Sequence, residues 1–148
     1  MTDPVEVSVR IAAKPSTVFR YFTDPERMVR WQGVRAQLDP RPGGDFLVDV
    51  TGRDVAIGEY VEVVQDERVV FTWGWEGNSG VPPGSTTVEV TLRPEGDDTV
   101  VTLVHSDLPD GDAAESHEAG WRHYLDRLQV AGPGGDPGDD PWVTEAVG

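Results

Sequence analysis

Two histidines, His105 and His117, are the side chains of this sequence best suited to exchange protons near neutral pH. His105 lies in a stretch that predicts a strand, and His117 lies in one that predicts a helix, so the fold could bring both imidazoles to one end of a cavity beside the Tyr124 phenol. Acid–base catalysis would need these groups within reach of one substrate atom. Buried histidines more commonly hydrogen-bond within a core. We therefore assign no catalytic residue and lean against an enzyme.

The other polar residues give no pattern typical of a metal or nucleophilic centre. His117 and His123 are six residues apart, so they fall on different faces of a helix, and we expect His123 to be exposed. Ser106 and Asp107 follow His105 directly, and neighbours in a strand point to opposite faces. The sequence contains no cysteine. We expect neither a metal nor a cofactor.

Carboxylates are expected mainly in turns and on outward faces, as for Asp39, Asp45, Asp49 and Asp54. Glu59 is the exception, because it shares strand parity with the apolar residues of 55–63 and could point inward. A bulge at Gly58 would reverse that parity and send Glu59 to solvent, so both orientations stay open.

A long amphipathic helix is predicted over residues 112–130. Asp112 is the expected N-cap, with Glu115 completing a capping-box-like pattern, and Gly132 and Pro133 mark the end. One face carries residues at three- and four-residue spacing: His117, Gly120, Trp121, Tyr124, Leu125 and Leu128. A single helix needs a surface on which to bury this face, and most of the preceding chain predicts strands.

Apolar residues alternate with polar ones in seven segments, a pattern typical of strands with one buried face. The segments are 5–11, a stretch from 34, 46–50, 55–64, 69–75, 88–92 and 101–105. Two short helices are expected between the first and second strands, from Pro15 and from Pro25. Short turns join the later strands, which predicts antiparallel pairing. We therefore predict an α+β fold: a seven-stranded, curved antiparallel sheet around the long C-terminal helix.

An aromatic chamber is expected between the sheet and the helix. Its predicted ligand-binding residues are Trp31, Phe46, Val48, Phe71, Trp73, Trp75, Val90, Leu103, His105, His117, Trp121 and Tyr124. Such walls suit a small hydrophobic molecule in a pocket of roughly 300–1,000 Å³. The alternative is that these large side chains simply fill the core.

The composition narrows the choice of partners. The 148-residue chain has 27 acidic and 12 basic residues, a formal net charge of −15. Such a charge disfavours binding to nucleic acids and anionic membranes. We expect no signal peptide and no membrane span, which favours a cytoplasmic protein. Residues 132–148, rich in Gly, Pro and Asp, predict a flexible tail, although Trp142 could insert into a groove on this or a neighbouring molecule.

Several segments resemble a known family when taken in order. They are PER at 25–27 with Trp31, DPRPGGDF at 39–46, GEYVEV at 58–63, VVFTW at 69–73, TLVHSDLP at 102–109 and HEAGW at 117–121 with Leu125 and Leu128. Together they resemble the family named after the activator of Hsp90 ATPase, a branch of the START-like superfamily with the helix-grip fold. The resemblance covers about residues 4–131 and implies one START-like domain at 1–131.

The resemblance implies a fold but does not determine the function. Stand-alone relatives are thought to hold a small hydrophobic ligand beneath the helix, so a binding protein of this kind is our first expectation. One alternative is an enzyme similar to polyketide cyclases and aromatases. Another is an interaction module associated with an Hsp90-type chaperone, and a homodimer would also fit. Fold-level analogy alone does not decide among these functions.

Overall fold

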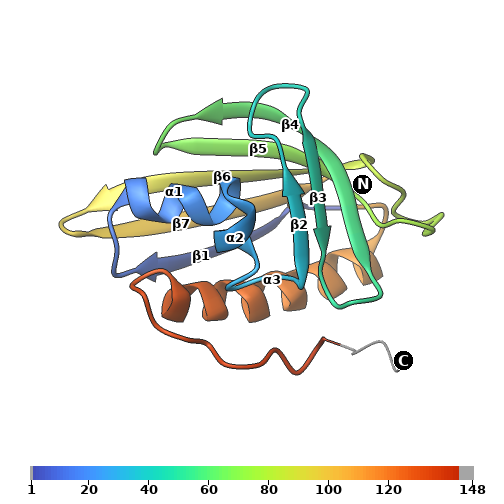
Figure 1. The fold of residues 1–148 in the computed structure, drawn as a ribbon. Helices are drawn as coiled ribbons and strands as arrows, with labels where there is room; N and C mark the ends of the chain where they lie inside the picture. The colour runs from blue at the N-terminus through green and yellow to red at the C-terminus, as the bar shows by residue number, and fades with distance from the viewer. Residues whose placement is uncertain (1, 144–148) are drawn as a thin grey trace.

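The computed structural model describes residues 2–143, which form a seven-stranded antiparallel sheet, two short helices and one long helix (Figure 1). In chain order the elements are β1 (Val5–Ile11), α1 (Pro15–Thr23), α2 (Pro25–Met28), β2 (Arg35–Leu38), β3 (Asp45–Asp49), β4 (Val55–Val64), β5 (Arg68–Trp73), β6 (Thr86–Glu95), β7 (Asp98–Ser106) and α3 (Gly111–Ala131). The strand order in the sheet is β1-β7-β6-β5-β4-β3-β2. The predicted helix-grip architecture is confirmed.

The order of the strands follows from the connections between them. Each strand from β2 to β7 lies beside its neighbour in sequence, and the connections between them contain no helix; the longest is the loop of residues 74–85 between β5 and β6. Helices α1 and α2 carry the chain from β1 to the opposite edge of the sheet, so β1 pairs with β7. Val7 lies opposite Leu103 in this pair, and both side chains are buried. The sheet curves around α3, and the core lies between them (Figure 1).

Helices α1 and α2 close one end of this core. Pro15 begins α1, and the Asp24 side chain caps α2 by accepting a hydrogen bond from the Glu26 backbone N–H. The Tyr21 hydroxyl donates to the carbonyl of Ala131 at the end of α3. Trp31, just after α2, donates its indole N–H to the Tyr21 carbonyl at 2.9 Å. These bonds join the two short helices to the C-terminal end of α3.

Strand β4 settles the orientation of Glu59, which is exposed. Ala56 and Tyr60 are buried, so the even-numbered residues of this part of β4 face the core. Gly58 is not a bulge; the register shift lies between Tyr60 and Glu62. Instead, Gly58 permits a close approach, because a Cβ there would lie 1.9 Å from the Thr72 carbonyl oxygen. The alternative in which Glu59 points inward is therefore wrong.

The N-cap of α3 lies two residues before the predicted one. Asp110, and not Asp112, is the N-cap: its backbone is extended and its side chain accepts from the Ala113 N–H at 2.9 Å. The helix ends at Gly132, as predicted. The predicted inward face is largely confirmed, since Trp121, Tyr124, Leu125 and Leu128 are all buried.

The segment after α3 doubles back along the outside of that helix (Figure 1). Arg127 donates to the Gly138 carbonyl, and the Tyr124 hydroxyl donates to Asp140 at 2.7 Å. The Trp142 ring stacks on His123, with ring centroids 3.9 Å apart. His123 is therefore half-buried, with its side chain 20% exposed, and the expectation of an exposed His123 is wrong. That 132–148 is flexible stays a prediction, and 144–148 lie outside the described residues.

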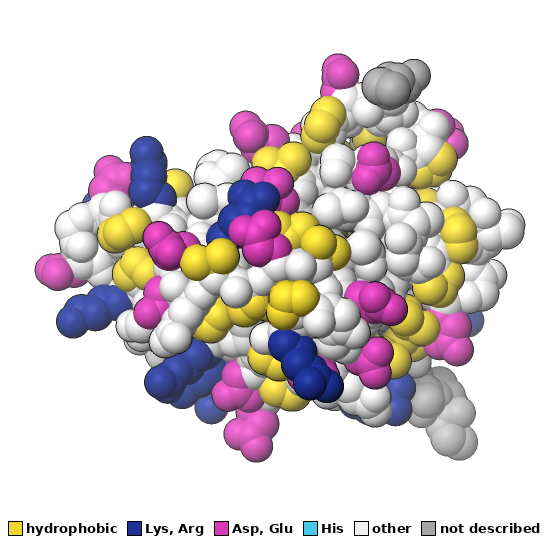
Figure 2. Space-filling model, turned by 90° about the horizontal axis from the view of Figure 1, so that it is seen from above, with side chains coloured by type: hydrophobic (Ala, Val, Ile, Leu, Met, Phe, Trp, Pro, Cys, Tyr) yellow, Lys and Arg dark blue, Asp and Glu magenta, His cyan; other side chains and the backbone are white. Residues whose placement is uncertain are grey.

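The surface carries its charges in a dispersed pattern. Figure 2 shows one face on which Lys and Arg side chains lie among acidic and hydrophobic ones and do not gather in one field. Ion pairs such as Arg10 with Asp98, at 2.7 Å, place individual arginines beside carboxylates. Within residues 2–143, no helix has both the length and the apolar composition to cross a bilayer.

Candidate functional site

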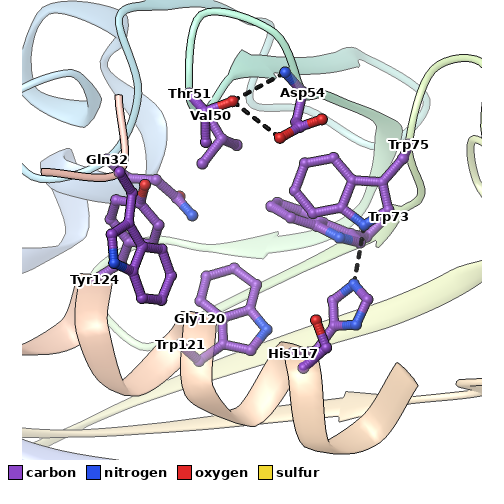
Figure 3. Close-up of a pocket in the computed structure, with 12 residues that line it drawn as sticks. Gln32, Val50, Thr51, Asp54, Trp73, Trp75, His117, Gly120, Trp121 and Tyr124 are labelled. Atoms are coloured by element: carbon purple, nitrogen blue, oxygen red, sulfur yellow. Dashed lines mark hydrogen bonds between the residues drawn. The ribbon is translucent and has the colours of Figure 1, made fainter. Parts of the chain in front are cut away.

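A pocket of about 210 Å³ lies between α3 and the turn that joins β3 to β4 (Figure 3). The residues that line it are Gln32, Val50, Thr51, Asp54, Trp73, Trp75, Ser116, His117, Gly120, Trp121, Tyr124 and Trp142. They come from the end of β5 and the loop that follows it, from one face of α3, from the β3–β4 turn, from the segment after α2 and from the segment after α3. The pocket is thus made by parts of the chain that are far apart in sequence.

Aromatic rings form most of its wall. Trp73 and Trp75 lie edge to face, with centroids 5.2 Å apart, and Trp121 approaches Trp73 at 5.0 Å. On the other side, Tyr124 and Trp142 are also edge to face, at 5.8 Å. Because the rings meet at steep angles, the wall presents both ring faces and ring edges to a bound molecule.

His117 lies at the pocket with both ring nitrogens engaged. Its Nδ1 is 2.7 Å from the Ala113 carbonyl oxygen, which can only accept, so Nδ1 carries the proton. Its Nε2 then accepts the Trp75 indole N–H at 3.0 Å (Figure 3). Burial lowers the pKa of His117, and the hydrogen bond to Ala113 opposes this in part. His117 is therefore a neutral imidazole that fixes the Trp75 ring.

His105 lies behind the pocket wall and is fully buried. The Thr86 hydroxyl donates to the Trp73 carbonyl at 2.7 Å, so it must accept from His105 Nε2, which is 2.8 Å away. Nδ1 is then free to accept the Trp121 indole N–H at 3.0 Å. Burial, with a smaller contribution from His117, lowers the pKa of His105 to about 3. His105 is thus a neutral connection between β6, β7 and α3.

Tyr124 and Asp140 form a third polar contact at the pocket edge. The phenol donates to Asp140 Oδ2 at 2.7 Å, and His123 lies 2.8 Å from Oδ1. Burial and then this hydrogen bond raise the pKa of Tyr124. Burial would raise the pKa of Asp140, but hydrogen bonds from the Trp142 N–H, Tyr124 and His123 lower it overall. The carboxylate therefore holds the segment after α3 against that helix.

Of the twelve predicted ligand-binding residues, five line the pocket: Trp73, Trp75, His117, Trp121 and Tyr124. The others are packed inside the core. Phe46 stacks on Phe71, with centroids 4.1 Å apart, and Trp31 packs against Phe22 at 5.2 Å. The remaining members of this group are buried and do not line the pocket: Val48, Val90, Leu103 and His105.

Seven lining residues are not among the predicted ligand-binding residues, although Trp142 is the one expected to insert into a groove: Gln32, Val50, Thr51, Asp54, Ser116, Gly120 and Trp142. Asp54 was expected to serve only a turn, and it does accept the Thr51 hydroxyl at 3.0 Å. Gly120 was already on the inward helical stripe, which was the one signal available for it. No local pattern indicates that the β3–β4 turn lies over α3.

Two further observations concern the chemistry of the site. In the described part of the chain, the Trp73 indole N–H is the one buried side-chain polar atom without a hydrogen-bond partner. Residues 2–143 contain no group of three or more His, Cys, Asp or Glu side chains arranged to hold a metal ion.

Comparison with known proteins relates this architecture to one family. The family model for activator of Hsp90 ATPase homolog 1-like proteins matches residues 12–131. No sequence among the curated proteins matches the chain. The AHSA1-like protein of Rhizobium etli is 43% identical, with 98% of this chain and 91% of that chain covered and a TM-score of 0.75.

Two other solved structures are more distant. DynU16, a putative protein of the dynemicin biosynthetic locus, is 27% identical with a TM-score of 0.83; the match covers 96% of this chain but 51% of DynU16. An Hsp90 activator from Plasmodium falciparum is 22% identical with a TM-score of 0.73, covering 87% and 95% of the two chains, and this likeness shows the fold alone. The match of the family model across most of the chain identifies it: the protein belongs to the family of activator of Hsp90 ATPase homolog 1-like proteins.

Proposed function

We propose that this protein binds a small hydrophobic molecule in the pocket between the sheet and α3. The observation that carries the proposal is the pocket of about 210 Å³ with five aromatic side chains in its wall. Two of these rings are held in place by hydrogen bonds to imidazoles: Trp75 to the half-buried His117 and Trp121 to the buried His105. A wall fixed in this way is prepared for a ligand before the ligand arrives, which lowers the entropic cost of binding.

The size of the pocket limits the ligand. Its volume lies below the roughly 300–1,000 Å³ typical of sites for drug-sized molecules, so the ligand should be small. A molecule that buries about 150 Å² of apolar surface gains about 4 kcal/mol from that burial. Part of this gain offsets the translational and rotational freedom that the ligand loses, so burial alone gives a dissociation constant no tighter than about 1 mM. Contacts to the polar groups of the wall would then set both specificity and additional affinity.

A cyclase-like enzyme is less well supported. Both nitrogens of His105 and both nitrogens of His117 are already in hydrogen bonds, and the Tyr124 proton is directed to Asp140. These groups could act on a substrate only after their bonds had been broken. A chaperone-associated module and a homodimer stay expectations from the resemblance, since the likeness to the Hsp90 activator supports the fold alone.

The first test is native mass spectrometry of freshly purified protein, followed by titration with a neutral fluorescent hydrophobic probe. Gly120→Leu fills the pocket without changing any of its hydrogen bonds, because a Cβ there meets nothing closer than the Trp142 ring at 4.0 Å. Ala119→Leu adds an apolar side chain to the exposed side of the same helix turn. We expect Gly120→Leu to abolish probe binding and Ala119→Leu to retain it. Equal binding by both variants would contradict the proposal.

A further inference from the structure

One acidic side chain, Asp54, lines the aromatic pocket, where it is exposed to solvent. Among the lining residues within 2–143, Asp54 is the only Asp, Glu, Lys or Arg, and the one histidine is His117. Thr51 fixes its position, since the Thr51 hydroxyl donates to the carboxylate at 3.0 Å and accepts the Asp54 backbone N–H at 3.0 Å (Figure 3). Asp54 makes no ion pair with the described residues. The pocket therefore contains an oriented anion without a cationic partner.

The arginine of α3 whose charge acts on Tyr124 is directed elsewhere. Arg127, one turn beyond Tyr124, donates to the carbonyl oxygens of Trp31 at 3.1 Å and Gly138 at 3.0 Å. It does not line the pocket. His117 supplies no positive charge, because burial lowers its pKa and its Nε2 accepts from Trp75. Nothing among these groups neutralises Asp54.

The negative charge acts across the pocket. Asp54 and Tyr124 lie on opposite sides of it in Figure 3. Burial and then the hydrogen bond to Asp140 are the main causes of the raised pKa of Tyr124; the charges of Asp140, Arg127 and Asp54 follow in decreasing order, and that of Arg127 has the opposite sign. A ligand between them would therefore experience the field of this carboxylate, and the formal net charge of −15 on the whole chain has the same sign.

Aromatic rings add to this preference. The face of an indole or phenol ring carries the negative part of its quadrupole, so it attracts an ammonium group. Five aromatic rings line the pocket together with Asp54, and Trp73 meets both Trp75 and Trp121 at a steep angle, as Tyr124 meets Trp142. Aromatic rings that surround an ammonium group are the arrangement by which proteins recognise quaternary ammonium ligands. A neutral ligand would instead dehydrate part of Asp54 without offering it a partner.

We propose that the ligand of this pocket is a small organic cation, whose ammonium group lies between Asp54 and the tryptophan rings and whose apolar part fills the rest of the pocket. This inference rests on the proposed function and specifies the chemical class of the ligand.

Choline and its neutral isostere 3,3-dimethylbutan-1-ol test the charge separately from the shape. Isothermal titration calorimetry on the full chain should show choline binding roughly tenfold more tightly than the alcohol. Asp54→Asn should weaken choline binding roughly five- to tenfold and change binding of the alcohol less than about twofold. Asp97→Asn removes the same charge from the exposed β6–β7 turn and should leave both affinities within about twofold.

The outcomes separate the two proposals. If the alcohol binds as tightly as choline, or if Asp54→Asn leaves choline binding unchanged, the cation inference is overturned while ligand binding in the pocket stands. If Gly120→Leu does not abolish choline binding, choline binds elsewhere and the inference is also overturned. If neither compound binds at millimolar concentrations, the inference fails; failure of the hydrophobic probe as well would overturn the proposed function too.

Discussion

Trp121 of α3 donates its indole N–H to Nδ1 of His105 on β7 at 3.0 Å, and both side chains are buried. This bond connects the long helix to β7, the second strand from one edge of the sheet, and fixes the ring that forms part of the pocket wall. The Nε2 atom of the same imidazole donates a hydrogen bond to the hydroxyl of Thr86 on β6. Three elements therefore meet at one neutral histidine, and its role is to hold the pocket together.

Replacing His105 tests this role. His105→Leu keeps approximately the same volume but leaves the Trp121 N–H without its acceptor. An unpaired buried polar group costs about 1–3 kcal/mol, so we expect the free energy of unfolding in urea to fall by about that amount. In a double-mutant cycle with Trp121→Phe, the two losses should not add, because they remove the same bond. Additive losses would show that the bond contributes nothing to stability.

The buried histidines also predict how stability depends on pH. Burial lowers the pKa of His105 to about 3 and lowers that of His117, whereas both should titrate near pH 6.5 when unfolded. The unfolded chain therefore binds more protons below about pH 6.5, and the folded protein loses stability as the pH falls from there towards the folded-state values. Above pH 7 this contribution is fully present.

Urea denaturation at several pH values between 4.5 and 7.5 measures this effect. The slope should approach about 1.4 kcal/mol per pH unit for each histidine that stays neutral in the folded state. Because carboxylates titrate mostly below this range, the comparison with His105→Leu isolates one histidine. We expect a shallower slope for the variant. An identical slope would mean that His105 becomes protonated in the folded protein.

The contacts of Asp140 lead us to predict that this residue holds the segment after α3 against the helix. Its carboxylate accepts from Tyr124 and lies 2.8 Å from His123. Asp140→Ala removes these contacts, so amide hydrogens of residues 134–142 should exchange roughly tenfold faster, equivalent to about 1.4 kcal/mol of local stability. The matched control is Asp139→Ala, since Asp139 is an exposed neighbour. Equal exchange in both variants would show that Asp140 does not secure the segment.

Gly58 should tolerate no side chain. A Cβ at this position would lie 1.9 Å from the Thr72 carbonyl oxygen on β5, so Gly58→Ala must move one strand away from the other. We expect a loss of more than about 2 kcal/mol in the free energy of unfolding. Gly111→Ala is the control, because a Cβ at this position at the start of α3 meets nothing within 4 Å. That variant should be neutral or slightly stabilised.

The local sequence pattern predicts the helices and strands and their order along the chain. The alternation of Val5, Val7 and Ile11 predicts β1, and the spacing of Trp121, Leu125 and Leu128 predicts the buried face of α3, because both patterns depend on the repeat of a single element. The orientation of Glu59 was left open, since strand parity states which residues share a face and does not say which face the core covers. The cap of α3 was misplaced because Asp110 and Asp112 are equally good capping residues in sequence.

The site depended on contacts between distant segments. His105 and His117 were correctly singled out as polar residues near one cavity end, with ring centroids 4.9 Å apart, but only their partners show that both are neutral and occupied. Asp54 and Trp142 line the pocket because the β3–β4 turn and the segment after α3 both return to the same helix. Periodicity shows which residues of a single helix or strand share a face. The place at which a turn or a returning segment packs depends on the whole tertiary structure. That placement determines which residues line the pocket.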